Sequence, residues 1–492
     1  MTKQEYLTLI DTVIENGKYK DDWASLSHHK TPDWFVNDKF GIFIHFGIYS
    51  VPAFGNEWYA RAMYDKNERE FEHHVKTYGN QNEFGYKDFI PMFKAEKFNA
   101  GEWADLFKKS GAKYVMPVAE HHDGFAMYET EFNRWNAKKM GPCKDIVGEL
   151  KNACDEKNLV FCASSHRAEH YFFMNMGRTF DSDVNNDEHA DFYGPAYYCP
   201  EFDSGTVHGT TADTYSRGAS QEWLEDWLVR TCELIDKYQP KIMYFDWWIH
   251  NHSFKPYLKK LAAYYYNRAG EWGKEVTINY KHEAFPPTVA TFDVERGALT
   301  DISPVPWQTD TAIGKKSWGY ITDNEYKPAR QIICDLVDIV SKNGNLLINI
   351  GPKADGTITE EETKVLLGIG EWLNANGEGI YGTTFWKQFG EGEVNAEEGF
   401  FKDYHEKKFT SEDFRFTYKN GFVYAFQMRP DGNDVKIKAF AKHNPHDFIV
   451  SSVTLLSTNE SLEFERTANE MIIKANDDFK SDNPICFKIE IN

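Results

Sequence analysis

The sequence predicts a (β/α)-barrel followed by a C-terminal antiparallel β-sandwich domain, and three observations support this fold class. First, residues 39–352 alternate between short apolar segments and longer amphipathic segments. Second, the apolar segments lack strict apolar–polar alternation, which is typical of parallel strands that are buried on both faces. Third, the chain has 492 residues and no GxGxxG motif after its first apolar segment, which favours a closed barrel over a doubly wound sheet.

The short apolar segments are the predicted strands of the barrel. Six of them are clear: residues 39–45, 114–120, 159–165, 241–246, 275–280 and 345–350. Residues 288–295 and 307–310 are weaker candidates for the sixth and seventh strands. The connections around these two are short and rich in proline, so we expect one or two barrel helices to be missing or shortened.

Two of the intervening segments have a clear helical pattern. In residues 220–238 the large apolar side chains fall on one stripe, and Pro240 follows as a stop signal. Residues 328–342 have the same pattern, and Gly344 is a candidate C-cap. Strands that alternate with helices in this way predict a parallel sheet.

The pattern changes after residue 384. Residues 385–413 are rich in Gly and Glu, and we expect a linker or an irregular segment there. From residue 414 onward, segments with a period of two are separated by Asn-Gly and Asp-Gly turns, which predicts a small antiparallel domain. The expected organisation is an N-terminal extension at 1–22, a barrel at 23–383 and a β-sandwich at 384–492.

Composition excludes several classes of protein. Hydrophobic residues make up 41% and charged residues 27%, which is typical of a globular chain. The net charge of −21 argues against nucleic acid or an anionic membrane as the main partner. The seven cysteines are scattered without a CxxC pair, so we expect neither a disulfide framework nor a structural zinc site.

The sequence also gives expectations about location and assembly. No stretch approaches ~20 apolar residues, so no transmembrane helix is expected. The N-terminal segment lacks the apolar core of a secretory signal, which predicts a cytoplasmic protein. The alternative is a secreted or periplasmic protein whose signal peptide has been removed. A homo-oligomer is left open.

Polar side chains follow almost every predicted strand. In a closed parallel barrel the active site lies at the carboxyl ends of the strands, so these side chains are expected to converge at one rim. Taken singly, each is explained as well by a polar cap on the following loop. The strand-end residues are His45, Glu120, His121, His122, Asp123, Ser165, His166, Asp246, Lys281, His282, Glu283, Glu295, Arg296 and Asp310.

Three chemistries are compatible with these residue types. The histidines together with Asp246 suit a metal-dependent barrel hydrolase, although adjacent His121 and His122 would face opposite sides of a continuing strand. A serine or cysteine nucleophile is disfavoured because no GxSxG elbow is present. Asp246, among aromatic residues, and Glu295 form a carboxylate pair that suits glycoside hydrolysis. We expect no metal and no other cofactor.

The order of these residues is similar to that of the glycoside hydrolase family 29 α-L-fucosidases. The resemblance lies in residues 33–64, in residues 95–128 with their EHHDGF motif, and in residues 335–358 and 377–383. It implies a retaining exo-α-L-fucosidase that removes terminal α-L-fucose from a fucosylated oligosaccharide or glycoconjugate by double displacement. The alternative within this resemblance is a fucose-binding protein whose catalytic pair has decayed.

The resemblance also implies roles for single residues. Asp246 matches the nucleophile, Glu295 is the expected acid/base, and Glu283 is the second choice. Trp247 follows the nucleophile where Gly is common, and Arg296 is expected to point away from Glu295 if the strand extends that far. The implied sugar-binding residues are His45, Glu57, Trp58, His121, His122, His166, Tyr244, Lys281 and Trp318.

Overall fold

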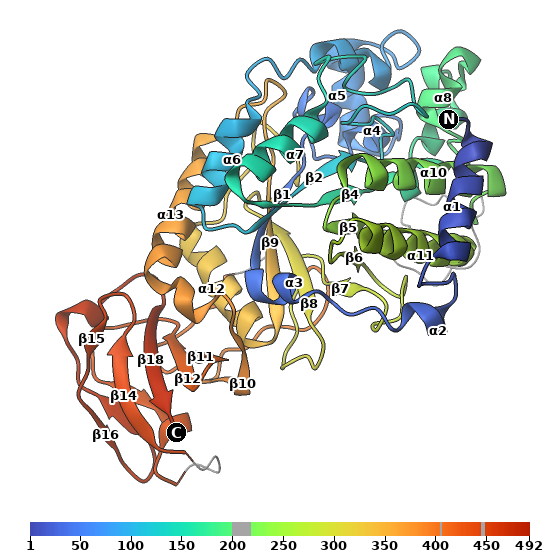
Figure 1. Cartoon of the computed structure of the whole chain (residues 1–492). Helices are drawn as coiled ribbons and strands as arrows, with labels where there is room; N and C mark the ends of the chain where they lie inside the picture. Colours follow the sequence, from blue (N-terminus) through green and yellow to red (C-terminus); the bar gives the residue numbers. More distant parts are fainter. Residues whose placement is uncertain (199–217, 404–405, 444–447) are drawn as a thin grey trace.

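The computed structural model describes residues 1–198, 218–403, 406–443 and 448–492, and it contains a closed parallel barrel beside two antiparallel sheets (Figure 1). Within the described residues the barrel sheet has the order β1-β9-β8-β7-β6-β5-β4-β2-β3, and pairing of β1 with β2 closes it. β3 and β4 both pair with β2 and form one interrupted barrel strand. The barrel strands are β1 (Phe40–Ile44), β2 (Tyr114–Glu120), β3 (Val160–Phe161), β4 (Ala163–Ser165), β5 (Ile242–Phe245), β6 (Thr277–Tyr280), β7 (Thr291–Asp293), β8 (Trp307–Ala312) and β9 (Gly344–Ile350).

The parallel barrel is confirmed, and every predicted strand coincides with an observed one. The least certain segment, residues 288–295, forms only the short strand β7. The backbone beyond β7 still bonds to β8, since the amide of Arg296 donates to the carbonyl of Asp310 at 2.7 Å. However, β7 ends at Asp293, and Arg296 has φ of +44°, a left-handed conformation that is not extended.

Helices surround the barrel except between β6 and β8. Residues 281–290 and 294–306, all of which the structure describes, form no helix, as the prolines predicted. The side chain of Ser220 caps α10 by accepting from the amide of Trp223. The α-helices of the described residues are α1 (Lys3–Asn16), α2 (Trp23–Leu26), α3 (Asp33–Asp38), α4 (Tyr59–Ala62), α5 (Arg69–Tyr78), α6 (Ala100–Lys109), α7 (Ile146–Lys157), α8 (Ala190–Tyr193), α10 (Gln221–Tyr238), α11 (Lys255–Glu271), α12 (Ala329–Ser341) and α13 (Glu360–Asn376).

The barrel interior is filled by side chains from several strands. Phe43, Met116, Tyr244 and Leu347 belong to one buried apolar cluster inside the barrel. Gly41 on β1 lies against this cluster, because a Cβ there would be 2.2 Å from the ring of Tyr114. The interior formed by these described residues is therefore a packed core rather than a ligand cavity.

The C-terminal part is a β-sandwich. A six-stranded sheet, β10-β11-β12-β18-β14-β15, faces a three-stranded sheet, β13-β17-β16, across a shared apolar core. In Figure 1 these orange and red strands lie beside α12 and α13. The strands are β10 (Thr384–Glu391), β11 (Phe414–Lys419), β12 (Phe422–Gln427), β13 (Val435–Ile437), β14 (Val450–Leu455), β15 (Glu460–Ser461), β16 (Phe464–Arg466), β17 (Met471–Ile473) and β18 (Ile485–Ile491).

One expectation about this part was wrong. Residues 384–391 form strand β10 rather than an irregular linker. The pairing of β10 with β11 shifts register between Phe385 and Gly390, so the segment lacks the period-two pattern of a regular strand. The domain limits at 22 and 383 stay a prediction.

Two further findings concern the described residues as a whole. Among the described helices, none combines the length and the apolar character that crossing a bilayer requires. The six cysteines in the described residues are free thiols, and Cys199 lies outside the described residues.

Candidate active site

A cavity of about 320 Å³ lies at the carboxyl ends of the barrel strands. Ten of the predicted site residues line it: His45, Glu57, Trp58, His121, His122, His166, Asp246, Lys281, Glu295 and Trp318. Trp247, Arg296, Asp310, Lys315, Lys316, Ser317 and Phe401 complete the lining. Tyr244 lies in the barrel core, and Glu283 is exposed and not part of this lining.

Asp246 follows β5 and is surrounded by positive and hydrogen-bonding groups. Its Oδ1 is 2.9 Å from Lys281 Nζ. Its Oδ2 is 3.1 Å from His166 Nδ1 and 3.3 Å from His122 Nε2. Burial alone would raise the pKa of Asp246, but the ammonium of Lys281 and the two histidines outweigh burial and hold the pKa well below its usual range. Asp246 is therefore a carboxylate at neutral pH.

Glu295 lies on the other side of the same ammonium. Its Oε2 accepts from Lys281 Nζ at 2.6 Å and from Trp247 Nε1 at 2.5 Å. Burial raises the pKa of Glu295 to about 7, with Asp310 and Asp246 adding to the rise and Lys281 opposing it. Since Lys281 Nζ contacts both carboxylates, Asp246 Oδ1 and Glu295 Oε2 are at most about 5.5 Å apart, the sum of the two distances.

A buried polar network contacts Lys281 through Asp310. The ammonium of Lys281 is 3.4 Å from Asp310, and the hydroxyl of Tyr244 donates to the same carboxylate at 2.9 Å. The neighbouring Asp293 accepts from Gln308 at 2.7 Å. Burial, together with the charge of Asp310, raises the pKa of Asp293 well above its usual range. Tyr244 thus contacts this buried polar network rather than the cavity.

Both members of the histidine pair line the cavity. β2 ends at Glu120, so the strand alternation that would have separated His121 from His122 does not apply. His122 donates from Nδ1 to the carbonyl of His166 at 2.8 Å. Burial lowers the pKa of His122, but the carboxylates of Glu169 and Asp246 outweigh burial and raise it.

His45 and His121 are expected to be neutral. Burial, assisted by the neighbouring His166, lowers the pKa of His45 well below its usual range. Burial, assisted by His122, does the same for His121. The Nδ1 atom of His45 lies 2.6 Å from the side-chain oxygen of Asn349, which orients the ring. Neutral imidazoles of this kind both donate and accept hydrogen bonds.

The wall that carries Trp318 is fixed by Glu57. Its Oε2 accepts from the hydroxyl of Ser317 and from the amide of Trp318, both at 2.9 Å. The guanidinium of Arg296 lies 4.6 Å from the centre of the Trp318 ring. The condition for an outward-pointing Arg296 is not met, because β7 ends at Asp293, and Arg296 lines the cavity.

Some of these side chains also have the spacing of metal ligands. One group is His45, His121 and His166, and another is His122, His166 and Asp246; in each, the donor atoms lie within 4.8 Å of one another. The ammonium of Lys281 at 2.9 Å from Asp246 opposes a second cation beside that carboxylate. The absence of a metal stays a prediction.

Seven of the lining residues were not predicted as site residues, and Trp247 and Phe401 are two of them. Trp247 directly follows a strand-end nucleophile candidate, so its position was a usable signal. Phe401 comes from the segment that the sequence presents as a linker, and nothing in the local pattern indicates that it reaches the cavity.

Comparison with known proteins agrees with the fold and the cavity. The alpha-L-fucosidase family model matches residues 7–378. Human tissue alpha-L-fucosidase is 32% identical over 375 residues, covering 75% of this chain and 73% of that protein. Plasma alpha-L-fucosidase of Pongo abelii is 30% identical over 392 residues, covering 75% and 74%.

Solved structures agree over almost the full chain. The Thermotoga maritima alpha-fucosidase in complex with fucose superposes with a TM-score of 0.74 at 30% identity, covering 96% of this chain and all of that one. A complex of the same enzyme with a mechanism-based inhibitor gives the same values. Since the family model spans about three quarters of the sequence and relatives at 30% identity or more cover a similar share, the chain belongs to the alpha-L-fucosidase family of glycoside hydrolases.

Proposed function

We propose that the protein is a retaining exo-α-L-fucosidase that hydrolyses terminal α-L-fucose from oligosaccharides or glycoconjugates. The observation that carries the proposal is the pair Asp246 and Glu295 on one ammonium, with oppositely shifted pKa values. Retaining glycosidases place their two carboxyl groups about 5–5.5 Å apart, which agrees with the upper limit set by Lys281. The Thermotoga maritima relative binds fucose and a mechanism-based inhibitor, which supports the choice of sugar.

In the first step Asp246 attacks the anomeric carbon and forms a fucosyl ester. Glu295 gives its proton to the leaving oxygen, which requires the carboxyl to be protonated in the free enzyme. The raised pKa of Glu295 supports this role, whereas the low pKa of Asp246 supports the role of nucleophile.

In the second step Glu295 acts as a base toward water. In the free enzyme the negative charge of Asp246 helps to hold the pKa of Glu295 high. Formation of the ester removes this charge, so the pKa of Glu295 falls. The remaining ammonium of Lys281 then favours the ionised form of Glu295. The same network thus supplies an acid before the ester forms and a base afterwards.

The buried histidines are assigned to the sugar hydroxyls. His45 and His121 are neutral at neutral pH and reach the cavity from β1 and β2. Hydrogen bonds from such positioned groups accelerate the reaction when they strengthen in the transition state. Trp58 and Trp318 provide apolar surface for the sugar ring. A cytoplasmic location stays a prediction.

The decisive experiment follows the anomer that is released first. Proton NMR of early turnover on an aryl α-L-fucoside is expected to show α-L-fucose before mutarotation. Asp246→Gly should lose nearly all turnover, and added azide should restore part of it with formation of the β-fucosyl azide. Initial release of β-L-fucose, or near-normal hydrolysis by Asp246→Gly, would contradict the mechanism. A fucose-binding protein with a decayed catalytic pair would bind fucose without turnover.

A further inference from the structure

A short segment from the region between barrel and sandwich returns to the rim of the catalytic cavity. This segment, residues 399–403, is called the rim strap below. The amide of Gly399 donates to Ala298 at 3.2 Å, that of Phe401 to Glu295 at 2.9 Å and that of Lys402 to Arg296 at 2.7 Å, in each case to the backbone carbonyl. The rim strap is therefore bonded along the stretch of chain that carries the proposed acid/base.

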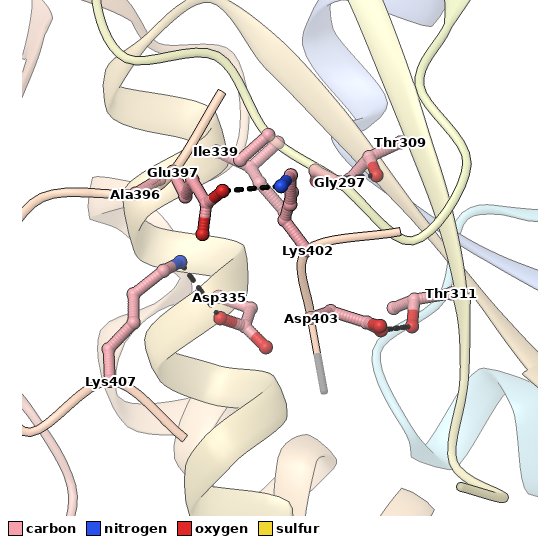
Figure 2. Close-up of a pocket in the computed structure, with 11 residues that line it drawn as sticks. Gly297, Thr309, Thr311, Asp335, Ile339, Ala396, Glu397, Lys402, Asp403 and Lys407 are labelled. Carbon is pink, nitrogen blue, oxygen red and sulfur yellow. Dashed lines mark hydrogen bonds and ion pairs between the residues drawn. The ribbon is translucent and has the colours of Figure 1, made fainter. Parts of the chain in front are cut away.

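Polar contacts fix the far end of the rim strap to the barrel. The carboxylate of Asp403 contacts the hydroxyl of Thr311 on β8 and the buried ammonium of Lys327. Figure 2 shows Asp403 directed at Thr311 and, next to it, Lys407 reaching Asp335 on α12, at 3.1 Å. The cavity between these groups has about 30 Å³, which is room for about one water molecule. The rim strap is thus packed onto the barrel.

Phe401 occupies an unfavourable position that the fold nevertheless maintains. Its φ is +58°, in the left-handed region that large side chains rarely adopt. The residue is 40% exposed although it is large and apolar, and it lines the catalytic cavity. A strained backbone and an exposed phenyl ring at a catalytic cavity together point to a binding role.

The ring of Phe401 extends an aromatic surface that begins at Trp247. The two ring planes are inclined by only 15°, with centres 6.4 Å apart. Phe400 supports Trp247 at 5.4 Å and packs against Phe292 at 6.0 Å. The half-buried Trp247 and the exposed Phe401 therefore both line the cavity, with ring planes that are nearly parallel.

The position of Glu295 identifies which part of a substrate meets this surface. The leaving oxygen must lie beside Glu295 to receive its proton. Trp247 donates its indole N–H to Glu295, and Phe401 bonds through its amide to the same residue's carbonyl. The aromatic surface therefore adjoins the leaving group, while His45 and His121 line the cavity from the first two barrel strands.

We propose that Trp247 and Phe401 form a platform that binds the sugar from which fucose is released. The proposal rests on the proposed fucosidase function and narrows its substrate class. A pyranose bonded directly to fucose has an apolar C–H face that stacks on such rings, whereas a leaving group without a ring gains little from them. The preferred substrates are therefore fucosylated oligosaccharides with a pyranose at the cleaved bond.

The test replaces the ring without straining the backbone. Phe401→Asn removes the aromatic surface with a residue that tolerates the left-handed conformation, and Phe401→Tyr is the matched control that keeps the ring. Trp247 is left intact because it contacts Glu295. Two substrates are compared by kcat/KM: a fucosyl-galactose disaccharide, and α-L-fucosyl fluoride, whose leaving group is too small to reach the platform. Thermal unfolding confirms that each variant is folded.

Phe401→Asn is expected to lower kcat/KM for the disaccharide about ten-fold. Turnover of fucosyl fluoride and inhibition by free L-fucose should stay unchanged, and Phe401→Tyr should resemble the wild type with both substrates. An equal loss on both substrates, or no loss on the disaccharide, would overturn the platform.

If the wild-type protein hydrolyses neither the disaccharide nor fucosyl fluoride, this result counts against the proposed function and not against the platform. Titration of the disaccharide followed by tryptophan fluorescence then tests the platform separately. Phe401→Asn should bind about ten-fold more weakly than wild type, and equal affinity would overturn the platform.

Discussion

The ammonium of Lys281 lies 2.6 Å from Oε2 of Glu295, yet the pKa of that carboxyl is raised to about 7. A cation at this distance normally lowers the pKa of a carboxyl. Here burial is the larger effect, and the same ammonium is shared with Asp246 and Asp310. Asp246 also contacts His122 and His166, so it ionises at a lower pH than Glu295. The asymmetry between the two carboxyls arises from their other neighbours.

This asymmetry predicts the pH dependence of the reaction. Glu295 must be protonated in the free enzyme, so kcat/KM should fall as the pH rises through about 7. Asp246 has a pKa well below its usual range and should stay ionised across the acidic side of the profile. Glu295→Gln should remove the alkaline limb for an activated aryl fucoside, which steady-state kinetics from pH 5 to about pH 9 measures. If the alkaline limb is unchanged in Glu295→Gln, the limb reports the titration of a group other than Glu295.

The loss of kcat/KM in Glu295→Ala should depend on the leaving group of the substrate. An activated aryl fucoside leaves without a proton and should still form the fucosyl-enzyme, whereas a fucosyl-oligosaccharide should nearly stop reacting. Glu283→Ala is the matched control, because Glu283 is exposed and not part of the cavity lining. Comparison of kcat/KM for the two substrates checks this. Leaving-group dependence in Glu283→Ala, with a mild and equal loss in Glu295→Ala, would reverse the assignment.

Removal of a histidine that we assign to the sugar hydroxyls should weaken transition-state binding. Replacement of His45, His121 or His122 by Ala is expected to cost about 2–4 kcal/mol in kcat/KM on simple fucosides, by analogy with other positioned donors. His28→Ala is the control, since His28 is exposed and is not among the cavity-lining residues. A loss of less than about 0.5 kcal/mol at all three positions would argue against sugar contacts there.

Chelation should leave the activity unchanged. His45, His121 and His166 are assigned to the sugar rather than to an ion, and Lys281 disfavours a cation at Asp246. Dialysis against EDTA, with metal analysis of the active protein before and after, checks this. Stoichiometric zinc that is lost together with the activity would support the metal-dependent hydrolase instead.

A buried ion cluster connects α12 to the sandwich. Asp338 accepts from Arg415 at 2.5 Å and from Lys342 at 3.0 Å, and Lys407 is 3.3 Å away. Asp338→Ala would leave these cations uncompensated and should lower the free energy of unfolding by about 3–5 kcal/mol. Asp323→Ala removes an exposed partner of Lys316 and should cost less than about 1 kcal/mol. Denaturant unfolding measures both, and equal costs would contradict the buried role.

The same cluster predicts a dependence of stability on pH. Burial opposes ionisation of Asp338, but Lys407, Arg415 and Lys342 outweigh burial and hold its pKa far below the usual value. Because the folded-state pKa is depressed, this contribution is complete above the unfolded value of about 4 and is lost as the pH falls below it. The acid-induced loss of stability should be smaller in Asp338→Asn than in wild type. Denaturant titrations at pH 7 and about pH 3 test this.

The sequence by itself determined the barrel and most of its rim. Residues 114–120 were predicted as a strand with the observed bounds, since a strand buried on both faces leaves a continuous apolar segment that is visible locally. The rim positions of His45 and Asp246 were predicted in the same way, because the residue after a parallel barrel strand lies at the carboxyl rim. The family resemblance supplied the expected roles.

Only the tertiary structure decided how these residues act together. The opposite pKa shifts of Asp246 and Glu295 require Lys281 between them, and that arrangement depends on the order of β5, β6 and β7 in the closed sheet. Strand β10 escaped prediction because a register shift interrupts its pattern. Phe401 escaped for a different reason: its place at the cavity comes from hydrogen bonds to residues about a hundred positions earlier. Local sequence patterns indicate which side chains are buried. The pairing of distant segments, and the sharing of one charge between several groups, arise only when the fold closes.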